Sequence, residues 1–188
     1  DGGLAYFQTL FNRCSAMMLK ITQLPQPVIA EVRGIATAAG CQLVATCDLA
    51  VAADDARFAT SGVNIGLFCS TPMVAVSRNV AQKHALEMLL TGDFLSAERD
   101  VEMGLINVAV PAEQLEQEAR AFADKIANKS PVAIRMGKQA YYQQVGMTLE
   151  EAYQLAARTM AENMMAHDTE AGIGAFIDKQ PMPEWSGQ

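Results

Sequence analysis

The sequence is poor in cysteine and histidine. It holds 4 cysteines and 2 histidines in 188 residues, no CxxC pair occurs, and the two histidines are far apart. Structural zinc sites and disulfide frameworks need cysteines or histidines at characteristic spacings, so both are disfavoured. We expect unpaired thiols in a reducing compartment, either the cytoplasm or, for a eukaryotic source, the mitochondrial matrix. We also expect neither a metal nor a cofactor.

Basic residues and long apolar runs are scarce as well. Lysine and arginine number 14 against 21 acidic residues, a formal net charge of -7, which disfavours a binder of nucleic acid or of an anionic membrane surface. The most hydrophobic segment, residues 28–53, is interrupted by Glu31, Arg33, Gln42 and Asp48. A membrane-spanning helix needs about 20 apolar residues, so no span is expected.

The first residues carry neither an initiator Met nor a targeting signal. The chain starts at Asp1, and "DGGLAYFQTLFNRC" has no basic start and no apolar signal-peptide core. We therefore expect that the numbered sequence begins inside a longer protein.

What the sequence does contain is the material of a globular α/β domain. Hydrophobic residues make up 51% of the chain and charged residues 19%, which is enough apolar surface for a sizeable core. Helical spacing and β-branched runs predict helix, strand, loop, helix, strand and strand over residues 4–24, 27–33, 34–38, 39–46, 48–53 and 56–61. After residue 70 helices dominate, apart from a strand at 105–111.

The stretch "GIATAAGCQLVATCD" combines a small-residue loop with a short buried helix that carries one amide, Gln42. Ala38, Ala39 and Gly40 place no bulky side chain before this helix. The first N–H groups of a helix lack internal acceptors and lie at its positive end, so they could polarise a carbonyl oxygen. Tight packing of the helix on a sheet would explain the same small residues.

Several motifs together resemble one family. "PVIAEVRGIATAAGCQLVATCDLAVAADDARFATSGVNIGL", "ALEMLLTGDFLSAERDVEMGLINVAVP" and "EAGIGAFIDK" are similar to the signature regions of the crotonase, or enoyl-CoA hydratase/isomerase, superfamily. The resemblance implies an α/β spiral of ββα turns, a coenzyme A thioester as ligand, and a homotrimer or dimer of trimers. It implies a core over residues 1–128, incomplete at its N-terminus, and a helical region over 129–188 for oligomerisation and pocket closure.

The resemblance also assigns residues. Two backbone N–H groups hold the thioester oxygen in that family. One belongs to Ala39, and the other belongs to a loop of the type AFxAGxDL, which does not occur here. The expected ligand-binding residues are Asn64, Leu67, Phe68, Cys69 and Ser70, together with Phe176 and Lys179 near the adenine and phosphates. We expect the Ala39 N–H to face a pocket bounded by Gln42, Gly62, Asn64, Leu67 and Phe68.

The two positions that carry catalytic glutamates in hydratases of the family are changed. They hold Gln42 and Gly62, neither of which can take a proton from water, and "FCSTPM" replaces a glycine-rich segment. Because general-base help is worth about 10²- to 10⁴-fold, hydration is expected to be weak or absent. Glutamates at both positions are expected to restore part of it.

Three interpretations of the function remain open. The first is an acyl-CoA enzyme of altered chemistry, such as thioester hydrolysis, in which Asn64, Cys69, Ser70 or Thr71 supplies a proton or a nucleophile. The second is a non-catalytic acyl-CoA binder or scaffold. The third is an ordinary hydratase, a lyase of acyl-CoA metabolism, in which another residue replaces the glutamates.

Overall fold

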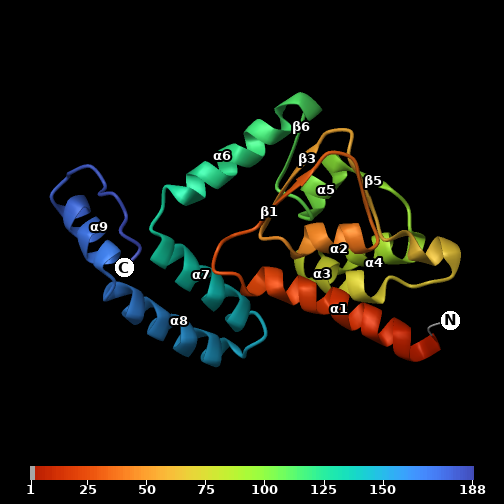
Figure 1. Ribbon diagram of the computed structural model, residues 1–188, viewed down its shortest axis with the longest axis horizontal. Coiled ribbons are helices and arrows are strands. Elements are labelled where there is room, and N and C mark those ends of the chain that lie inside the picture. The colour runs from red at the N-terminus through yellow and green to blue at the C-terminus, as the bar shows by residue number, and fades with distance from the viewer. Residues whose placement is uncertain (1–2) are drawn as a thin grey trace. The chain divides into compact units, whose positions relative to one another are not determined.

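The computed structural model describes residues 3–188. The chain divides into two compact units (Figure 1). Unit 1 holds residues 3–22 and 28–121, and unit 2 holds residues 23–27 and 122–188. Helix α6, Leu115–Ala127, follows a short 3-10 turn, Ala112–Gln114, and contains the boundary between the units.

Unit 1 is built from successive strand–strand–helix turns. The first turn consists of β1 (Ile29–Val32), β2 (Ile35–Thr37) and α2 (Ala39–Thr46). The second consists of β3 (Leu49–Ala53), β4 (Arg57–Ala59), the 3-10 helix η1 (Ser61–Ile65) and α3 (Ser70–Asn79). Then follow α4 (Gln82–Thr91), β5 (Leu95–Ser96), α5 (Ala97–Met103) and β6 (Val108–Val110).

Each turn contributes one strand to each of two sheets. The first sheet has the order β1-β3-β6 and is parallel, with Ile29 opposite Leu49 and Val51 opposite Val108. The second has the order β2-β4-β5, in which β2 and β4 are parallel and β5 is antiparallel to β4. This alternation is the ββα spiral expected from the sequence, so the α/β prediction is confirmed.

The predicted loop over residues 34–38 is wrong for residues 35–37. These residues form β2, which pairs with β4 through Ala36 opposite Phe58. Three residues are too few to show an alternating pattern, so only the pairing partner reveals the strand. Strand β5, two residues long, was missed for the same reason.

The core of unit 1 forms around the central strand β3. Residues 50–53 of β3 are buried, and three of them are alanines, whose small side chains permit close packing. Phe58, Val76 and Met88 fill the space around them with no exposed surface. Buried Thr60, the residue between β4 and η1, donates its hydroxyl to the Met88 carbonyl at 2.7 Å. The start of η1 is therefore tied to α4.

Helix α1, Gly3–Gln23, keeps one face against unit 1, where Met18 is buried. It runs beside α2 (Figure 1), and the Cys14 thiol approaches the Gln42 side-chain oxygen at 3.9 Å. Its other side chains include exposed aromatic and aliphatic residues, among them Leu4, Tyr6, Phe7 and Leu10.

Unit 2 consists of the end of α6 and the helices α7 (Pro131–Gln144), α8 (Leu149–Met164) and α9 (His167–Ile177). Helix α8 begins with a capping box, because the Thr148 hydroxyl accepts the Glu151 N–H while the Glu151 carboxylate accepts the Thr148 N–H. Pro131 occupies the first turn of α7, a position at which proline is favoured.

Asp168, at the start of α9, holds the last residues of the chain. Its carboxylate accepts hydrogen bonds from the Ser130 hydroxyl, the Ser186 hydroxyl and N–H, and the Gly187 N–H. Trp185 donates its indole N–H to the Asn128 carbonyl at 3.0 Å. The C-terminal residues are thus fixed to the starts of α7 and α9.

Within residues 3–188 no helix combines the length and the apolar character that crossing a membrane requires.

Candidate functional site

The residue before α2 has a strained backbone. Ala38 adopts φ 50 and ψ -116, and a positive φ of this kind costs on the order of 1–3 kcal/mol for a residue with a Cβ. Two hydrogen bonds of 3.0 Å hold it, from the Ala38 N–H to the Ala59 carbonyl and from the Gln42 N–H to the Ala38 carbonyl. They fix the plane of the next peptide, and with it the direction of the Ala39 N–H.

Ala39 is the first residue of α2 and is exposed. Its N–H has no hydrogen-bond acceptor within the part of the chain that the structure describes. A regular helical hydrogen bond would have excluded this N–H as a donor to a ligand. The geometry leaves it able to donate to a carbonyl or anionic oxygen, at the positive end of the helix dipole.

Gln42 lies one turn further along α2 and is only 4% exposed. Its side-chain oxygen receives the long contact from the Cys14 thiol, whereas its NH₂ group has no hydrogen-bond partner among residues 3–188. A buried amide with a free donor can orient a water or a ligand oxygen, but it cannot act as a base.

No side chain fits at Gly62 in the present backbone. A Cβ on this residue would lie 2.2 Å from the Leu67 carbonyl oxygen and 2.8 Å from the Cys69 sulfur. The turn that brings them there is closed by the Leu67 N–H, which donates to the Gly62 carbonyl at 2.9 Å. The expectation that glutamates at positions 42 and 62 restore hydration conflicts with this geometry, because a carboxylate at residue 62 requires the backbone of residues 62–69 to move.

Two polar residues of the same region, Asn64 and Ser70, have internal partners. The Asn64 amide donates to the Gly92 carbonyl at 3.1 Å, and the Ser70 hydroxyl donates to the Phe68 carbonyl at 3.4 Å. Asn64 therefore holds the loop after α4 against η1. Within the "FCSTPM" segment, the Cys69 sulfur is the side-chain atom that lies next to the Cβ position of Gly62.

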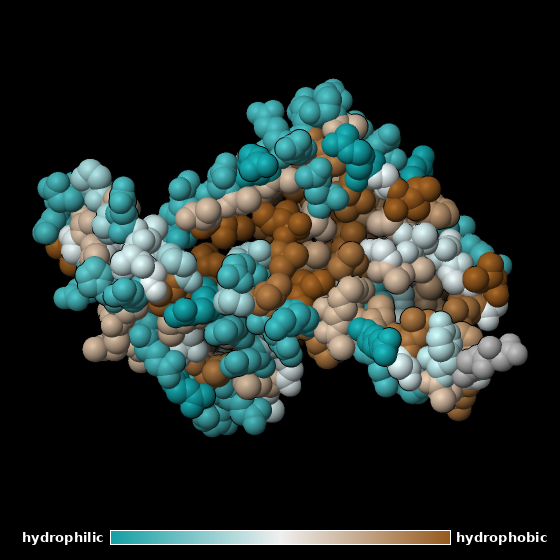
Figure 2. Space-filling view, viewed as in Figure 1, coloured by the Kyte–Doolittle hydropathy of each residue, from teal (hydrophilic) through white to brown (hydrophobic). Residues whose placement is uncertain are grey.

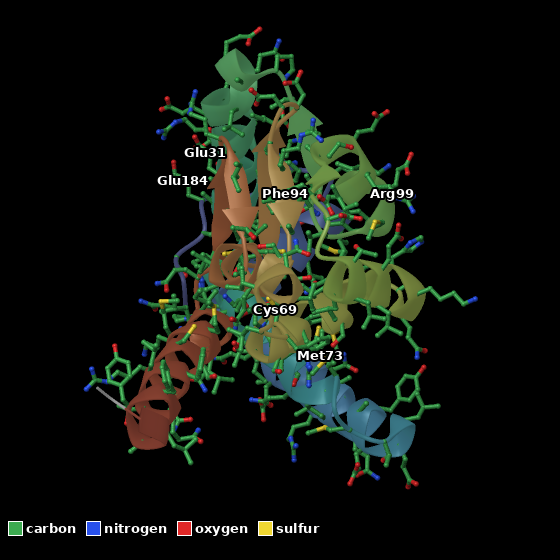
Figure 3. All side chains as sticks on the ribbon, turned by 90° about the vertical axis from the view of Figure 1, so that its right-hand side faces the viewer. Glu31, Cys69, Met73, Phe94, Arg99 and Glu184 are labelled. Atoms are coloured by element: carbon green, nitrogen blue, oxygen red, sulfur yellow. The ribbon has the colours of Figure 1, made fainter. Side chains whose placement is uncertain are left out.

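Exposed apolar side chains surround this segment. Apolar residues are visible at the end of unit 1 that carries η1 and the loop after α4 (Figure 2). They include Ile65, Leu67, Phe68, Met73, Leu90 and Phe94. Cys69 and Met73 mark the first turn of α3 (Figure 3). Such a surface suits an apolar chain, because contact would remove it from water.

A buried carboxyl was missed by the sequence reasoning. Asp100 has no exposed surface, and neither of its carboxylate oxygens has a hydrogen-bond partner within residues 3–188. Burial raises its pKa to about 7, against a smaller opposing effect of the Arg99 guanidinium. The available signal was helical spacing, since Asp100 stands three residues from both Ala97 and Met103, which are buried.

Asp100 belongs to a buried group with two thiols. Burial raises the pKa of Cys41 to about 12, and the charges of Asp100 and Cys69 add to the effect. Cys41 is therefore an inert thiol at neutral pH, whereas Cys69 lies at the edge of the group, next to Gly62.

Phe176 and Lys179 lie in unit 2. Phe176 is 76% exposed near the end of α9, and Lys179 follows the helix with φ 53. Their expected contact with adenine and phosphates stays a prediction. Residues 3–188 contain no group of three or more histidine, cysteine or acidic side chains that could hold a metal ion.

Two cavities lie away from these residues. One, of about 130 Å³, is lined by α7 and α8 residues such as Gly137 and Leu155. The other, of about 80 Å³, is lined by the ends of α2 and α3 and by residues 104–107.

Comparison with known proteins identifies the family to which this chain is similar. A model of the enoyl-CoA hydratase/isomerase family matches residues 5–188. Enoyl-CoA hydratase domain-containing protein 3, mitochondrial, from Rattus norvegicus is 50% identical over 98% of this chain and 61% of its own length. The Homo sapiens protein of the same name is 47% identical over 99% of this chain and 61% of its own length.

Solved structures show the same fold. A crystal structure of an enoyl-CoA hydratase from Mycobacterium smegmatis superposes with a TM-score of 0.96 at 52% identity, over 98% of this chain and 72% of that one. The crystal structure of human enoyl-CoA hydratase domain-containing protein 3 gives 0.93 at 46% identity, over 96% and 72%. The chain thus spans about 61% of the length of the curated relatives named above.

Proposed function

The chain belongs to the enoyl-CoA hydratase/isomerase family, and from this premise we propose that unit 1 binds an acyl-CoA thioester whose carbonyl oxygen accepts the Ala39 N–H. The observation that carries the proposal is the unpaired Ala39 N–H beside a strained Ala38. Strained backbone occurs mainly at functional sites, so the strain at Ala38 suggests that the N–H it orients, that of Ala39, binds a ligand. The exposed apolar residues near Cys69 would receive the acyl chain.

We further propose that this protein hydrates enoyl-CoA weakly or not at all. Gln42 cannot deprotonate water, and Gly62 has neither a carboxylate nor space for one. The loss of general-base help alone corresponds to about 10²- to 10⁴-fold in rate. What remains of the hydratase arrangement in this sequence is the polarising Ala39 N–H.

Other features of the whole protein follow the family. We propose a homotrimer or dimer of trimers, in which Phe176 and Lys179 border the adenine and phosphates, with no cofactor or metal. A second N–H donor to the thioester oxygen is proposed from residues outside this sequence. For a eukaryotic source, the mitochondrial location in the names of the rat and human relatives is proposed.

The test compares two ligands that differ by one oxygen. Butyryl-CoA has the thioester carbonyl, and the butyl thioether of CoA lacks it. Calorimetry should show tighter binding of the thioester to the wild type. Ala39→Pro removes the N–H of the first helical residue and should lower thioester affinity toward that of the thioether.

The matched control is Ala39→Ser, which keeps the N–H and should keep the preference for the thioester. Equal affinity of the wild type for the two ligands would contradict the role of the Ala39 N–H. A spectrophotometric assay with crotonyl-CoA completes the test, and rapid hydration by the wild type would overturn the reading of Gln42 and Gly62. Binding without hydration would leave a non-catalytic acyl-CoA binder or an enzyme of different chemistry, such as thioester hydrolysis.

A further inference from the structure

Two side-chain hydroxyls join the segments on either side of the proposed thioester site. The Thr37 and Ser61 hydroxyl oxygens lie 2.8 Å apart, within hydrogen-bond distance, and both residues are half-buried. Thr37 is the last residue of β2 and directly precedes strained Ala38. Ser61 is the first residue of η1 and directly precedes Gly62. The bond therefore connects the strand that leads to the Ala39 N–H with the short helix that carries Gly62.

Strand β2 is short, and the strain lies at its end. Among residues 3–188 it pairs with β4 alone, through three residues whose register ends at Thr37 opposite Ala59. Its other two residues are apolar, so Thr37 supplies the only side-chain hydrogen bond of this strand. Short strands lose their pairing most easily at their ends. The Thr37 hydroxyl therefore acts where the strain of Ala38 opposes the pairing of β2.

Helix η1 offers a fixed anchor for this bond. The Thr60 hydroxyl and the Asn64 amide donate to carbonyls of α4 and of the loop that follows it. These bonds hold both ends of η1 without any contribution from β2. Ser61 lies between the two attached residues, so its hydroxyl is held in place when it meets Thr37.

We propose that Thr37 and Ser61 are positioning residues of the thioester site, an inference that rests on the proposed function. Their hydroxyl bond keeps Ala38 at positive φ and so directs the Ala39 N–H toward the thioester oxygen. The pair acts through the backbone and not through contact with the ligand. Without the bond, the end of β2 shifts and Ala38 relaxes, which turns the following peptide plane and the N–H within it.

The proposal predicts an effect that depends on the carbonyl of the ligand. A ligand without the thioester carbonyl does not use the Ala39 N–H, so its affinity should not depend on the hydroxyl pair. The preference for butyryl-CoA over the butyl thioether of CoA should fall by about 2- to 10-fold, the range that one neutral hydrogen bond contributes to an equilibrium constant. The stretching frequency of the bound carbonyl, which hydrogen bonding lowers, should return toward its value in water-free solvent.

The experiment combines calorimetry of both ligands with infrared spectra of butyryl-CoA carrying ¹³C at the carbonyl, each bound to the full-length protein. Thr37→Val and Ser61→Ala should each reduce the thioester preference and the infrared shift. The double variant should lose no more than either single one, because both remove the same bond. Thr37→Ser keeps the hydroxyl and should keep both readouts.

The matched control is Thr9→Val, which removes a 2.9 Å hydroxyl bond to the Ala5 carbonyl within α1 and should leave both readouts unchanged. An unchanged preference in Thr37→Val and Ser61→Ala would overturn the proposal, and so would an equal loss of affinity for both ligands. If Thr37→Val does not fold, Ser61→Ala, the smaller change, decides by the same measurements. In these cases the thioester site stands, whereas a wild type without any thioester preference would remove the proposed role of Ala39 and this inference with it.

Discussion

Ala38 donates its N–H to the Ala59 carbonyl at 3.0 Å, and this bond ties a strained residue of one ββα turn to β4 of the next. The strain is local, because the neighbouring residues of β2 and α2 have regular conformations. The position is therefore suited to a direct measurement of its energetic cost.

The first prediction concerns Ala38→Gly. Glycine adopts positive φ without steric cost, so relief of about 1–3 kcal/mol of strain should exceed the added flexibility of the unfolded chain, about 0.5–1 kcal/mol. Urea unfolding should show a variant at least as stable as the wild type. The control is Ala45→Gly in the buried part of α2, which should lose about 1 kcal/mol or more. Equal losses in both variants would mean that Ala38 is not strained.

The second prediction concerns Gly62→Ala. The new Cβ would meet the Leu67 carbonyl oxygen, a backbone atom that cannot rotate away, so a loss of about 1–3 kcal/mol is expected. Gly40→Ala serves as the control, because nothing lies within 4 Å of its Cβ position and the residue is in α2. That control should gain about 0.5–1 kcal/mol. Thermal or urea unfolding measures both variants. An unchanged free energy of unfolding for Gly62→Ala would show that the backbone of residues 62–69 adjusts without cost.

The third prediction concerns Asp100 and pH. The folded state raises the pKa of Asp100 from 3.8 to about 7 through burial, so the folded state favours the protonated carboxyl. The free energy of unfolding should therefore fall as pH rises from about 4 to about 7 and level off above that range. Asp100→Ala should flatten this dependence and stabilise the protein at pH 8 by about 1–3 kcal/mol, the cost of one unpaired buried polar group.

Urea unfolding of the wild type and Asp100→Ala at pH 5 and pH 8 tests this. Asp124→Ala, in which an acid of α6 is removed instead, should leave the slope between the two pH values unchanged. Parallel pH profiles for the wild type and Asp100→Ala would show that Asp100 is ionised without cost.

The fourth prediction concerns Asp168 and the C-terminus. Burial by itself raises the pKa of Asp168. Hydrogen bonds from Ser130, Ser186 and Gly187 lower this pKa by more, so that it falls from 3.8 to about 2. Its contribution to stability is thus present above about 4 and is lost as pH falls toward 2. Asp168→Ala should release the C-terminal residues at neutral pH. Trp185, the single tryptophan, should report this as a red shift of fluorescence, since its indole would leave the Asn128 carbonyl and become more exposed to water.

Asp178→Ala is the control for the fourth prediction, because Asp178 is exposed at the other end of α9. Its emission spectrum should match that of the wild type. A spectrum of Asp168→Ala that also matches the wild type would contradict the assigned role of the carboxylate.

The fifth prediction concerns assembly. The helices of unit 2 expose large apolar side chains, among them Tyr153, Met160, Met165, Phe176 and Ile177. Such a set is unusual on a monomer surface, so we expect sedimentation to show a trimer or a dimer of trimers at micromolar concentration. Tyr153→Glu should weaken the assembly, whereas Glu162→Lys, a change at a polar position of the same helix, should affect it less. A monomeric wild type would contradict the proposal.

The sequence alone determined the family and most of the elements. The helical spacing of apolar residues and the runs of β-branched residues predicted α1, β1, β3 and the long helices. The small residues before Gln42 predicted the start of α2. These signals are local, because helix periodicity and helix starts depend on residues a few positions apart. The sequence also showed that Gln42 and Gly62 lack the chemistry of a general base.

Only the tertiary structure decided what fills the space at Gly62 and where Asp100 lies. The Leu67 carbonyl and the Cys69 sulfur take that space because the turn after η1 folds back, and no residue type in "GLFCSTP" dictates the direction of a backbone carbonyl. In the sequence, nothing distinguishes Asp100 from an exposed polar residue of a short helix. In the fold, packing of α5 on the two sheets buries it beside Cys41. Burial and close approach are set by elements distant in sequence, which is why local pattern could not predict them.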